Sequence, residues 1–449
     1  MNRLLFAAVA DDDTGASDLA GMLAGQGLRT LLIIDLPTTE QFAEWSNGYH
    51  AVVMAEGTRN LPPEAARERT LAAMQILKAC DPRIFQIKYC STFDSTSKGN
   101  IGTSIDAALD ELEEAFTIAV PALPVNGRTT YQGYHFVNGQ LLDHSPMRDH
   151  PLTPMTNSNL VELLRRQTKR RVGLAPYSEV EGGVEQLKKC FEDLRAQGVA
   201  IAIVDCLNDQ HLEIICRAAA DLRLISGSSA FGINMPEVWR ERGWIAEQTK
   251  GFDDLSFDAS SVAANNHGCL IIAGSCSVAT RGQNEWLAAQ GTHAIHISPQ
   301  NLLTPDFKRT AFIEQARNEL NAGRHCLLTT TNSLTEVRRA QEWGENQGLP
   351  VSAFGESLAY ALADVAAEIL QNETVGGLIV AGGETSGAVC RRMQFGALRV
   401  GRNIEHGVPL CFSLGNHQLP VVLKSGNFGS VDFYGKALQA IAQPAKYMI

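Results

Sequence analysis

Three consecutive aspartates follow an apolar run near the start of the chain. Residues 10–16 read ADDDTGA, directly after the run that ends at Val9, and a helix is expected to follow. Adjacent carboxylates repel one another, so three of them at a strand end require cations, a metal ion or protons as partners. Asp11 and Asp12 are therefore candidates for binding a hydroxyl-bearing ligand or Mg²⁺. The alternative is an acidic cluster that caps the following helix.

A second polar loop follows the apolar run 84–87. It extends from Cys90 to Gly102 and is rich in hydroxyl groups, and its glycines would let the backbone approach a ligand closely at a helix start. Such a loop suits a polyhydroxy carboxylate, while the alternative is an ordinary polar turn between a strand and a helix. The candidate ligand-binding residues of this region are Lys88, Asp94, Ser95, Lys98 and Asn100.

Two arginines stand just past predicted strands. Arg59 follows the run 51–55, and Arg128 follows the run 115–120. A planar guanidinium can hold a carboxylate through two hydrogen bonds, so both side chains are candidates for binding an acidic substrate. Either arginine alone could instead be a solvated surface charge.

Glycine-rich and serine-rich turns follow three apolar runs in the second half of the chain. A strand-to-helix turn of this kind points backbone N–H groups and the positive end of a helix at an anion, which suits a nucleotide phosphate. The turn after residue 381 is not a Walker motif, because no lysine stands at the required place, and tight-turn packing is the alternative. The candidate nucleotide-binding residues are Ser275, Ser277, Gly382, Gly383, Glu384, Thr385, Ser386, Ser425 and Gly426.

Apolar runs alternate with amphipathic stretches throughout, which predicts parallel strands covered by helices. One exception is the stretch 131–142, where Asn138-Gly139 predicts a two-residue hairpin turn at the edge of the sheet. The predicted strands are 4–9, 30–34, 51–55, 84–87, 115–120, 200–204, 222–225, 269–273, 294–297, 326–329, 378–381 and 420–423, and two of the predicted helices are 62–80 and 184–196.

The length of 449 residues favours two domains. A polar, aperiodic stretch separates the halves, so we predict a substrate-binding domain over 1–250, a linker over 251–266 and a nucleotide-binding domain over 267–449. The predicted fold class is α/β, with a mostly parallel sheet flanked by helices in each domain. Because such sheets bind ligands beyond the carboxyl ends of their strands, we expect the active site in the cleft between the domains.

Composition narrows the class of protein. Hydrophobic residues make up 45% and charged residues 19% of the chain, which is typical of a folded protein. The net charge of −11 and the lack of a basic run argue against binding nucleic acid or an anionic membrane. No apolar stretch is long enough for a membrane span or a signal peptide, and the 10 cysteines form no CxxC pair, so we expect a cytoplasmic protein with reduced thiols.

These motifs together resemble the four-carbon acid sugar kinase family over nearly the whole chain. The family's ADD-x-TGA pattern is matched at residues 10–16, its DST-x-[RK]-GN-x-G pattern at 94–102 and its P-x-x-P-x-x-GRTT pattern at 121–130. Its GG[DE]T and SG-x-FG patterns are matched at 382–385 and 425–429. Two positions depart from the common pattern: Asp13 stands where the family usually has an apolar residue, and Lys98 where many relatives have Arg.

The resemblance implies an ATP-dependent kinase with a sugar-acid domain followed by a nucleotide domain. ATP with Mg²⁺ would bind the C-terminal loops, and the terminal 4-hydroxyl of a four-carbon sugar acid would be phosphorylated. The sequence CSTF at 90–93 resembles members that act on 3-oxo-tetronate. Asp12 is our first candidate for the general base and Asp94 the second, while Arg59, Lys88 and Arg128 are candidates for the substrate carboxylate.

Other functions fit the same layout. Within the family, the alternative is a D-threonate or D-erythronate 4-kinase. A nicotinamide-dependent sugar-acid dehydrogenase is weakened by the absence of a GxGxxG turn with a following acidic residue. A non-catalytic sugar-acid-binding protein is the third reading. The partners expected are small molecules, with a homodimer as a candidate assembly.

Overall fold

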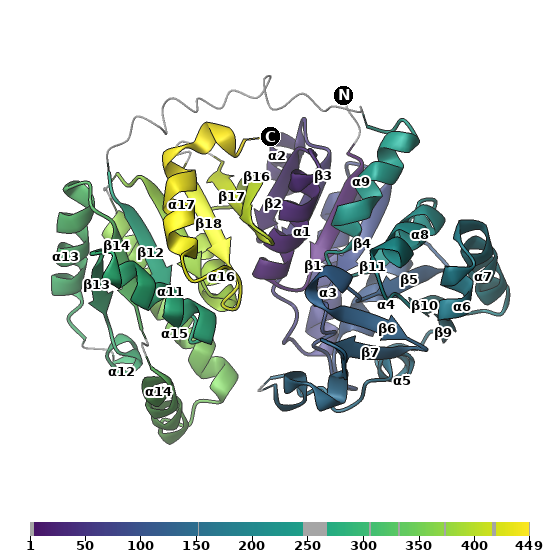
Figure 1. The fold of residues 1–449 in the computed structure, drawn as a ribbon, viewed down its shortest axis with the longest axis horizontal. Coiled ribbons are helices and arrows are strands. Elements are labelled where there is room, and N and C mark those ends of the chain that lie inside the picture. The colour runs from purple at the N-terminus through teal and green to yellow at the C-terminus, as the bar shows by residue number, and fades with distance from the viewer. Residues whose placement is uncertain are drawn as a thin grey trace. The chain divides into compact units, whose positions relative to one another are not determined.

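The computed structural model describes residues 4–150, 152–245, 267–304, 307–330, 333–371, 374–414 and 419–448. The chain divides into two compact units, 1–249 and 250–449, whose elements are labelled in Figure 1. The stretch 251–266, predicted as a linker, lies outside the described residues.

The first unit is built on a parallel sheet whose central strands are buried along their length. Such strands face helices on both sides, which explains why they appear in the sequence as uninterrupted apolar runs. In spatial order the strands are β2 (Thr30–Ile34), β3 (Ala51–Ala55), β1 (Phe6–Ala10), β4 (Ile84–Lys88), β11 (Leu224–Gly227), β5 (Thr117–Val120), β10 (Ile201–Val204) and β9 (Val172–Ala175).

Two layers of helices cover this sheet, and within each layer every helix packs against the next. One layer contains α1 (Asp13–Gly25), α9 (Phe231–Glu241), α8 (Asp209–Ala219), α7 (Val184–Ala196) and α6 (Tyr177–Glu181). The other contains α3 (Pro63–Lys78), α4 (Ile101–Leu112) and α5 (Leu160–Arg165), and α2 (Thr39–Ser46) connects β2 to β3. This unit also contains the short 3₁₀ helices η1 (Pro124–Asn126), η2 (Leu142–His144) and η3 (Pro146–Asp149).

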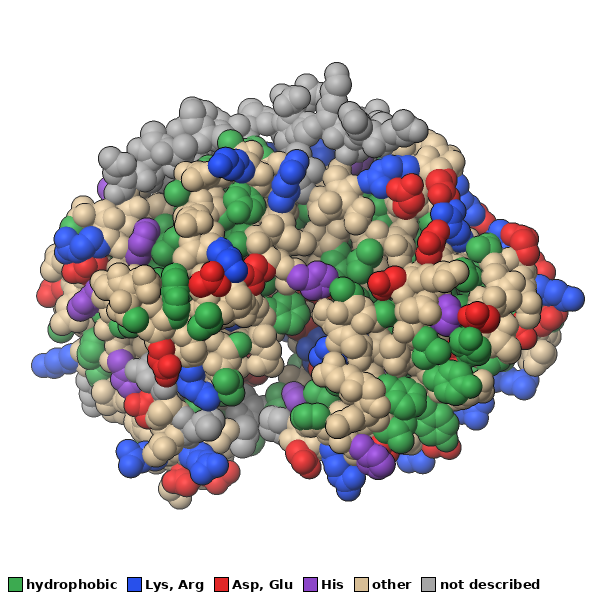
Figure 2. All heavy atoms as spheres, viewed as in Figure 1, with side chains coloured by type: hydrophobic (Ala, Val, Ile, Leu, Met, Phe, Trp, Pro, Cys, Tyr) green, Lys and Arg blue, Asp and Glu red, His purple; other side chains and the backbone are tan. Residues whose placement is uncertain are grey.

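A separate antiparallel sheet of three short strands decorates the first unit: β6 (Arg128–Tyr131), β7 (Tyr134–Val137) and β8 (Gln140–Leu141). The predicted turn at Asn138-Gly139 is confirmed, with positive φ at both residues (51° and 79°), as a type I′ hairpin requires. The hairpin belongs to this small sheet, and an isolated bridge joins Thr130 to Cys206, which lies just past the end of β10 in the main sheet. Figure 2 shows a hydrophobic patch over β6 and β7, where Tyr131 and Tyr134 are each 44% exposed.

The second unit has a mixed sheet with five parallel strands and an antiparallel edge. The order is β13 (His293–His296), β14 (Cys326–Thr329), β12 (Cys269–Ala273), β15 (Gly377–Ala381), β18 (Pro420–Lys424), β17 (Val408–Ser413) and β16 (Ala397–Glu405). The strands from β13 to β18 are parallel, while β17 and β16 run antiparallel. The α/β fold class, with mostly parallel sheets flanked by helices, is therefore confirmed.

Helices of the second unit also form two groups. Around α15 (Val351–Leu370) pack α12 (Pro299–Leu303), α13 (Thr310–Asn321), α14 (Leu334–Asn346) and α16 (Gly383–Arg392). The other group pairs α11 (Val278–Ala289) with α17 (Phe433–Ala442), and η4 (Pro444–Lys446) follows. Phe412, Phe433 and Tyr434 are fully buried in the core between α17 and the sheet. Over the described ranges, no helix combines the length and the hydrophobicity needed to cross a membrane.

Candidate active site

The polar loops of the first unit meet where three neighbouring strands end. β1 lies between β3 and β4, and in register Ala10 is paired with both Ala55 and Lys88. Backbone hydrogen bonds extend this pairing into the loops: the N–H of Asp11 donates to the Lys88 carbonyl, and the N–H of Arg59 donates to the Asp11 carbonyl, each at 3.0 Å. The strand order therefore fixes the backbones of three sequence-distant candidates next to one another.

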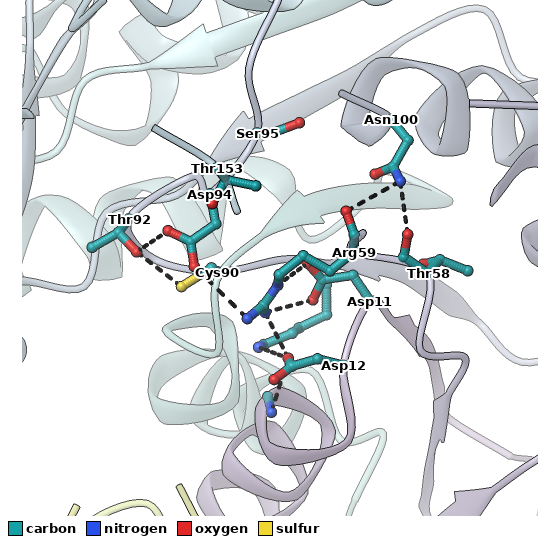
Figure 3. Close-up of polar contacts among 12 residues, drawn as sticks. Asp11, Asp12, Thr58, Arg59, Cys90, Thr92, Asp94, Ser95, Asn100 and Thr153 are labelled. Carbon is teal, nitrogen blue, oxygen red and sulfur yellow. Dashed lines mark hydrogen bonds and ion pairs between the residues drawn. The ribbon is translucent and has the colours of Figure 1, made fainter. Parts of the chain in front are cut away.

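Arg59 is the centre of the resulting charge cluster. Its Nε and Nη2 donate to the two carboxylate oxygens of Asp11 at 2.8 and 2.9 Å, and Nη2 also donates to Oδ1 of Asp12 at 2.6 Å (Figure 3). Its Nη1 approaches Oδ2 of Asp94 at 3.7 Å. The predicted candidates Asp11, Asp12, Arg59 and Asp94 are thus brought together, with Nη1 making the longest of these contacts.

Asp12 has a second role as the cap of α1. Its carboxylate accepts hydrogen bonds from the Gly15 N–H at 3.0 Å and from the Thr14 hydroxyl at 2.7 Å. The ammonium of Lys88 lies 3.8 Å from Oδ1 of Asp12, and its side chain is only 4% exposed. A Cβ atom at Gly15 would come within 1.9 Å of Lys88 Nζ, so glycine is what lets the ammonium approach the helix start. The buried Lys88 ammonium therefore lies next to the Asp12 carboxylate at the start of α1.

The environment shifts the pKa values of these groups in different directions. Burial raises the pKa of Asp11, and the charge of Arg59 offsets only part of that rise. Burial also acts to raise the pKa of Asp12, but the charges of Arg59 and Lys88 outweigh it and the pKa lies at about 2. Two neighbouring carboxylates consequently differ in basicity although they share one arginine.

Asp94 lies on a corner of unusual backbone geometry. Phe93 and Asp94 have φ values of 65° and 33°, a left-handed conformation that is rare outside glycine and that is found in functional loops. The hydroxyl of Thr92 donates to Oδ1 of Asp94 at 2.6 Å, and the Cys90 thiol lies 3.0 Å from the same hydroxyl. Burial raises the pKa of Cys90 to about 12, so its thiol stays protonated and is a poor nucleophile.

Asn100 and Ser95 hold loops in place. The Asn100 amide donates to the carbonyls of Thr58 at 2.7 Å and Arg59 at 3.3 Å (Figure 3). It also donates to the Leu61 carbonyl at 2.9 Å, and these bonds fix the loop that carries Arg59. The Ser95 hydroxyl accepts a hydrogen bond at 3.0 Å from Gln167, whose Oε1 accepts from the Gly102 N–H at 3.0 Å. Gln167 thus ties the start of α4 to the Ser95 loop.

Three predicted residues, Ser95, Lys98 and Arg128, are not joined to the charge cluster by hydrogen bonds or ion pairs of the described residues. Lys98 is exposed. Arg128, at the start of β6, donates from Nη1 to the Asn126 carbonyl, while its Nε is buried with no partner among those residues.

Buried His135 donates from Nε2 to the Ser91 carbonyl at 2.7 Å and accepts from Thr130 at 3.0 Å. Burial lowers the pKa of His135 to about 4. The charge of Arg128 also lowers this pKa, while the charge of Asp94 raises it.

In the second unit, too, polar loops meet where neighbouring parallel strands end, here at the ends of β12, β15 and β18. Gly382, with φ of 127°, precedes α16, and its N–H donates to the Lys424 carbonyl at 2.8 Å. The N–H groups of Gly274 and Ser275 both donate to the Ala381 carbonyl at 3.1 Å. The three loops that contain the predicted nucleotide-binding residues are therefore neighbours.

Close backbone approaches leave no room for side chains where these loops meet. A Cβ atom at Gly426 would come within 2.2 Å of the Ser275 hydroxyl, and one at Gly274 within 2.1 Å of the Thr385 hydroxyl. Ser277 donates to the Gly426 carbonyl at 2.6 Å and caps α11. In the first turn of α16, which begins at Gly383, Glu384 is exposed, whereas Ser386 is buried. An open helix start beside glycine and serine backbone fits a phosphate group.

Three buried polar residues that contact these loops were not among the predicted site residues. Gln167 and His135 lie far in sequence from the loops they hold, and Lys424 ends the strand β18. No local signal marks such residues, because a buried polar side chain is recognisable only once its partners are known. The described ranges contain no group of three or more His, Cys, Asp or Glu residues that could hold a metal ion.

Comparison with known proteins matches both units. Residues 6–235 match the model of a sugar-binding N-terminal domain, and residues 270–434 that of a nucleotide-binding C-terminal domain. The chain is 40% identical to the 3-oxo-tetronate kinase of Pseudomonas savastanoi pv. phaseolicola over 99% of both chains. It is also 40% identical to the 3-oxo-tetronate kinase of Cupriavidus necator over 98% of both.

A solved structure from Salmonella typhimurium LT2 is 32% identical, with a TM-score of 0.79 over 97% of this chain and 98% of that one. The matches therefore extend over both units and not over isolated motifs. The chain belongs to the four-carbon acid sugar kinase family.

Proposed function

We propose that this protein is an ATP-dependent kinase that phosphorylates the 4-hydroxyl of 3-oxo-tetronate. The observation that carries the proposal is the 40% identity to kinases of that name over nearly the full length of the chain. An activity that requires a sugar domain and a nucleotide domain can be transferred only where both are covered, as they are here. Phosphoryl transfer demands mainly positioning and neutralisation of charge, which fits two sets of polar loops at strand ends.

The sugar acid is assigned to the cluster around Arg59. Nε and Nη2 of this guanidinium already hold Asp11 and Asp12, so Nη1 is the nitrogen with donors left for a substrate carboxylate or hydroxyl. Arg128, whose Nε has no partner within the described part of the chain, is the second candidate for the carboxylate. Ser95, Lys98 and Asn100 lie in the loop assigned to the sugar's remaining oxygens.

Asp12 remains the first candidate for the general base and Asp94 the second. With a pKa of about 2, Asp12 is ionised at neutral pH but weakly basic. A loose transition state for phosphoryl transfer releases the hydroxyl proton late, so a weak base in the correct position is sufficient. The proton of the 4-hydroxyl would pass to the carboxylate as the oxygen bonds to phosphorus and ADP leaves.

The nucleotide is assigned to the loops after β12, β15 and β18. Glycine at 426 and 274 lets these loops pack closely, because a Cβ atom at either position would collide with a hydroxyl of the neighbouring loop, and the backbones of the loops are thereby gathered at one edge of the sheet. Bound ATP would bring Mg²⁺ on its phosphates, which supplies charge neutralisation during transfer. The predicted cleft between the domains stays part of this proposal, since transfer requires the two sites to face one another.

Substrate-dependent release of ADP tests the assignment. The purified protein is incubated with ATP, Mg²⁺ and either 3-oxo-tetronate, D-threonate or D-erythronate. We expect the highest kcat/KM with 3-oxo-tetronate. ADP release with only D-threonate or D-erythronate would move the substrate within the family. If all three acids fail while one of them reduces NAD⁺ or binds without reaction, the kinase assignment is wrong and a dehydrogenase or a binding protein takes its place.

A further inference from the structure

Lys424, the last residue of β18, has an ammonium that is completely buried. Its Nζ donates to the Thr280 hydroxyl at 3.1 Å and to the carbonyls of Ser425, Gly426 and Phe428 at 3.0, 3.1 and 3.2 Å. All of these oxygens are neutral, and no carboxylate among the described residues pairs with this ammonium. Burying an ammonium without a counter-ion is costly, and burial lowers the pKa of Lys424 to about 8.

The contacts of Lys424 determine how the following loop presents its backbone. In a trans peptide the carbonyl and the next residue's N–H point in opposite directions, and no peptide bond among the described residues is cis. Because the carbonyls of Ser425 and Gly426 point inward at Nζ, the N–H groups of Gly426 and Asn427 point away from it. They are thereby left available for an anion.

The same ammonium also connects two loops of the predicted nucleotide site. Thr280, on α11, accepts from Lys424 and donates to the Gly426 carbonyl at 2.8 Å, and Ser277 donates to that carbonyl at 2.6 Å. A Cβ atom at Gly426 would meet the Ser275 hydroxyl at 2.2 Å. The carbonyl of Gly426 therefore accepts three hydrogen bonds, which hold the loop after β18 against the loop after β12.

We propose that Lys424 is a positioning residue for the nucleotide. It holds the carbonyls of Ser425 and Gly426 inward, so that the N–H groups of Gly426 and Asn427 face the phosphates, and it places a positive charge behind those N–H groups. A charge in a low-dielectric interior is weakly screened by salt. It would favour a polyphosphate in a chain whose net charge is −11. The inference rests on the proposed function, because it requires a nucleotide at this site.

Two substitutions of Lys424 separate the effect of its hydrogen bonds from the effect of its positive charge. Lys424→Met removes both the charge and the donors, whereas Lys424→Gln keeps amide donors without the charge. Lys446→Met, at an exposed lysine of the same unit, is the matched control. Dissociation constants for ATP and adenosine are measured by calorimetry, KM for ATP and for the sugar acid by ADP release, and folding by thermal unfolding.

We expect Lys424→Met to raise the Kd for ATP at least tenfold while the KM for the sugar acid stays within twofold. Lys424→Gln should recover part of the loss, and it should weaken ATP more than adenosine, since the charge acts on phosphates. A folded Lys424→Gln variant whose affinities for ATP and adenosine both match the wild type would overturn the proposal. Should Lys424→Met not fold, the Gln variant alone decides.

The outcomes also distinguish this inference from the proposed function. If the wild-type protein does not bind ATP, or if Gly383→Val binds it normally, the assignment of the nucleotide site fails. If the wild type binds ATP and Gly383→Val weakens it, but Lys424→Gln binds both ligands normally, only the role of Lys424 is wrong.

Discussion

Replacing Asp12 with Asn separates its chemical role from its structural one. An Asn side chain can still accept the hydrogen bond from the Gly15 N–H, so the cap on α1 is retained. It cannot accept a proton at neutral pH. A general base typically contributes 10²- to 10⁴-fold, and we expect kcat to fall by about that factor with ATP affinity unchanged.

The cost in stability follows from the pKa of Asp12. A fall from 3.8 to about 2 in the folded protein corresponds to roughly 2 kcal/mol of stability at pH 7. A unit of about 250 residues loses roughly 2–4 °C in Tm per kcal/mol, so Asp12→Asn should lower Tm by at most about 8 °C. Because the pKa is depressed, this contribution is present above pH of about 4 and disappears as the pH falls through about 2. The two proteins should therefore converge in stability on acidification.

The assay couples ADP release to absorbance at saturating sugar acid and ATP, with circular dichroism to follow unfolding. Asp209→Asn is the matched control, since Asp209 is an exposed aspartate in the first turn of α8. A fall in kcat of less than about fivefold would refute the assignment of Asp12 as the base. Asp94→Asn is then the next test, and a large loss there would move the role to the second loop.

Three further substitutions probe the two sites. Gly383→Val should weaken ATP at least tenfold by calorimetry while sugar-acid binding is retained; unchanged affinity in a folded variant would exclude this turn from the phosphate site. Arg128→Ala should cost about 1.5–3 kcal/mol, which is roughly a ten- to 150-fold rise in the KM for the sugar acid, and normal kinetics would place this arginine outside the site. Gly15→Ala would bring a methyl group within 1.9 Å of Lys88 Nζ and 2.2 Å of Asp12 Oδ1, so both Tm and kcat should fall; a wild-type kcat would show that the cluster tolerates the shift.

Strands buried on both faces could be predicted from the sequence. The runs 30–34, 51–55 and 269–273 coincide with β2, β3 and β12, because a strand covered by helices on both sides needs apolar residues throughout. β9, β16 and β17 were not predicted. β9 is a short edge strand that contains Gly173, and β16 includes four polar residues, at 399, 402, 403 and 405, so it does not form an uninterrupted apolar run.

The residues of each polar loop were also readable from the sequence, since each follows an apolar run. Which loops meet was decided by the tertiary structure. Strand order places β1 between β3 and β4, so Asp11 and Asp12 meet Arg59 across 47 or 48 positions of sequence. No local pattern encodes that order, because it depends on how whole βαβ units pack.

The tertiary structure also determined which groups each charged side chain contacts. Lys88 and Lys424 are both lysines that end apolar strands, and the sequence alone determined only that each stands at the edge of a sheet. In the fold, the Lys88 ammonium lies 3.8 Å from a carboxylate, while the Lys424 ammonium contacts three carbonyls and a hydroxyl. The physical reason is that a buried charge takes the nearest compensating groups, and these come from segments far away in the sequence.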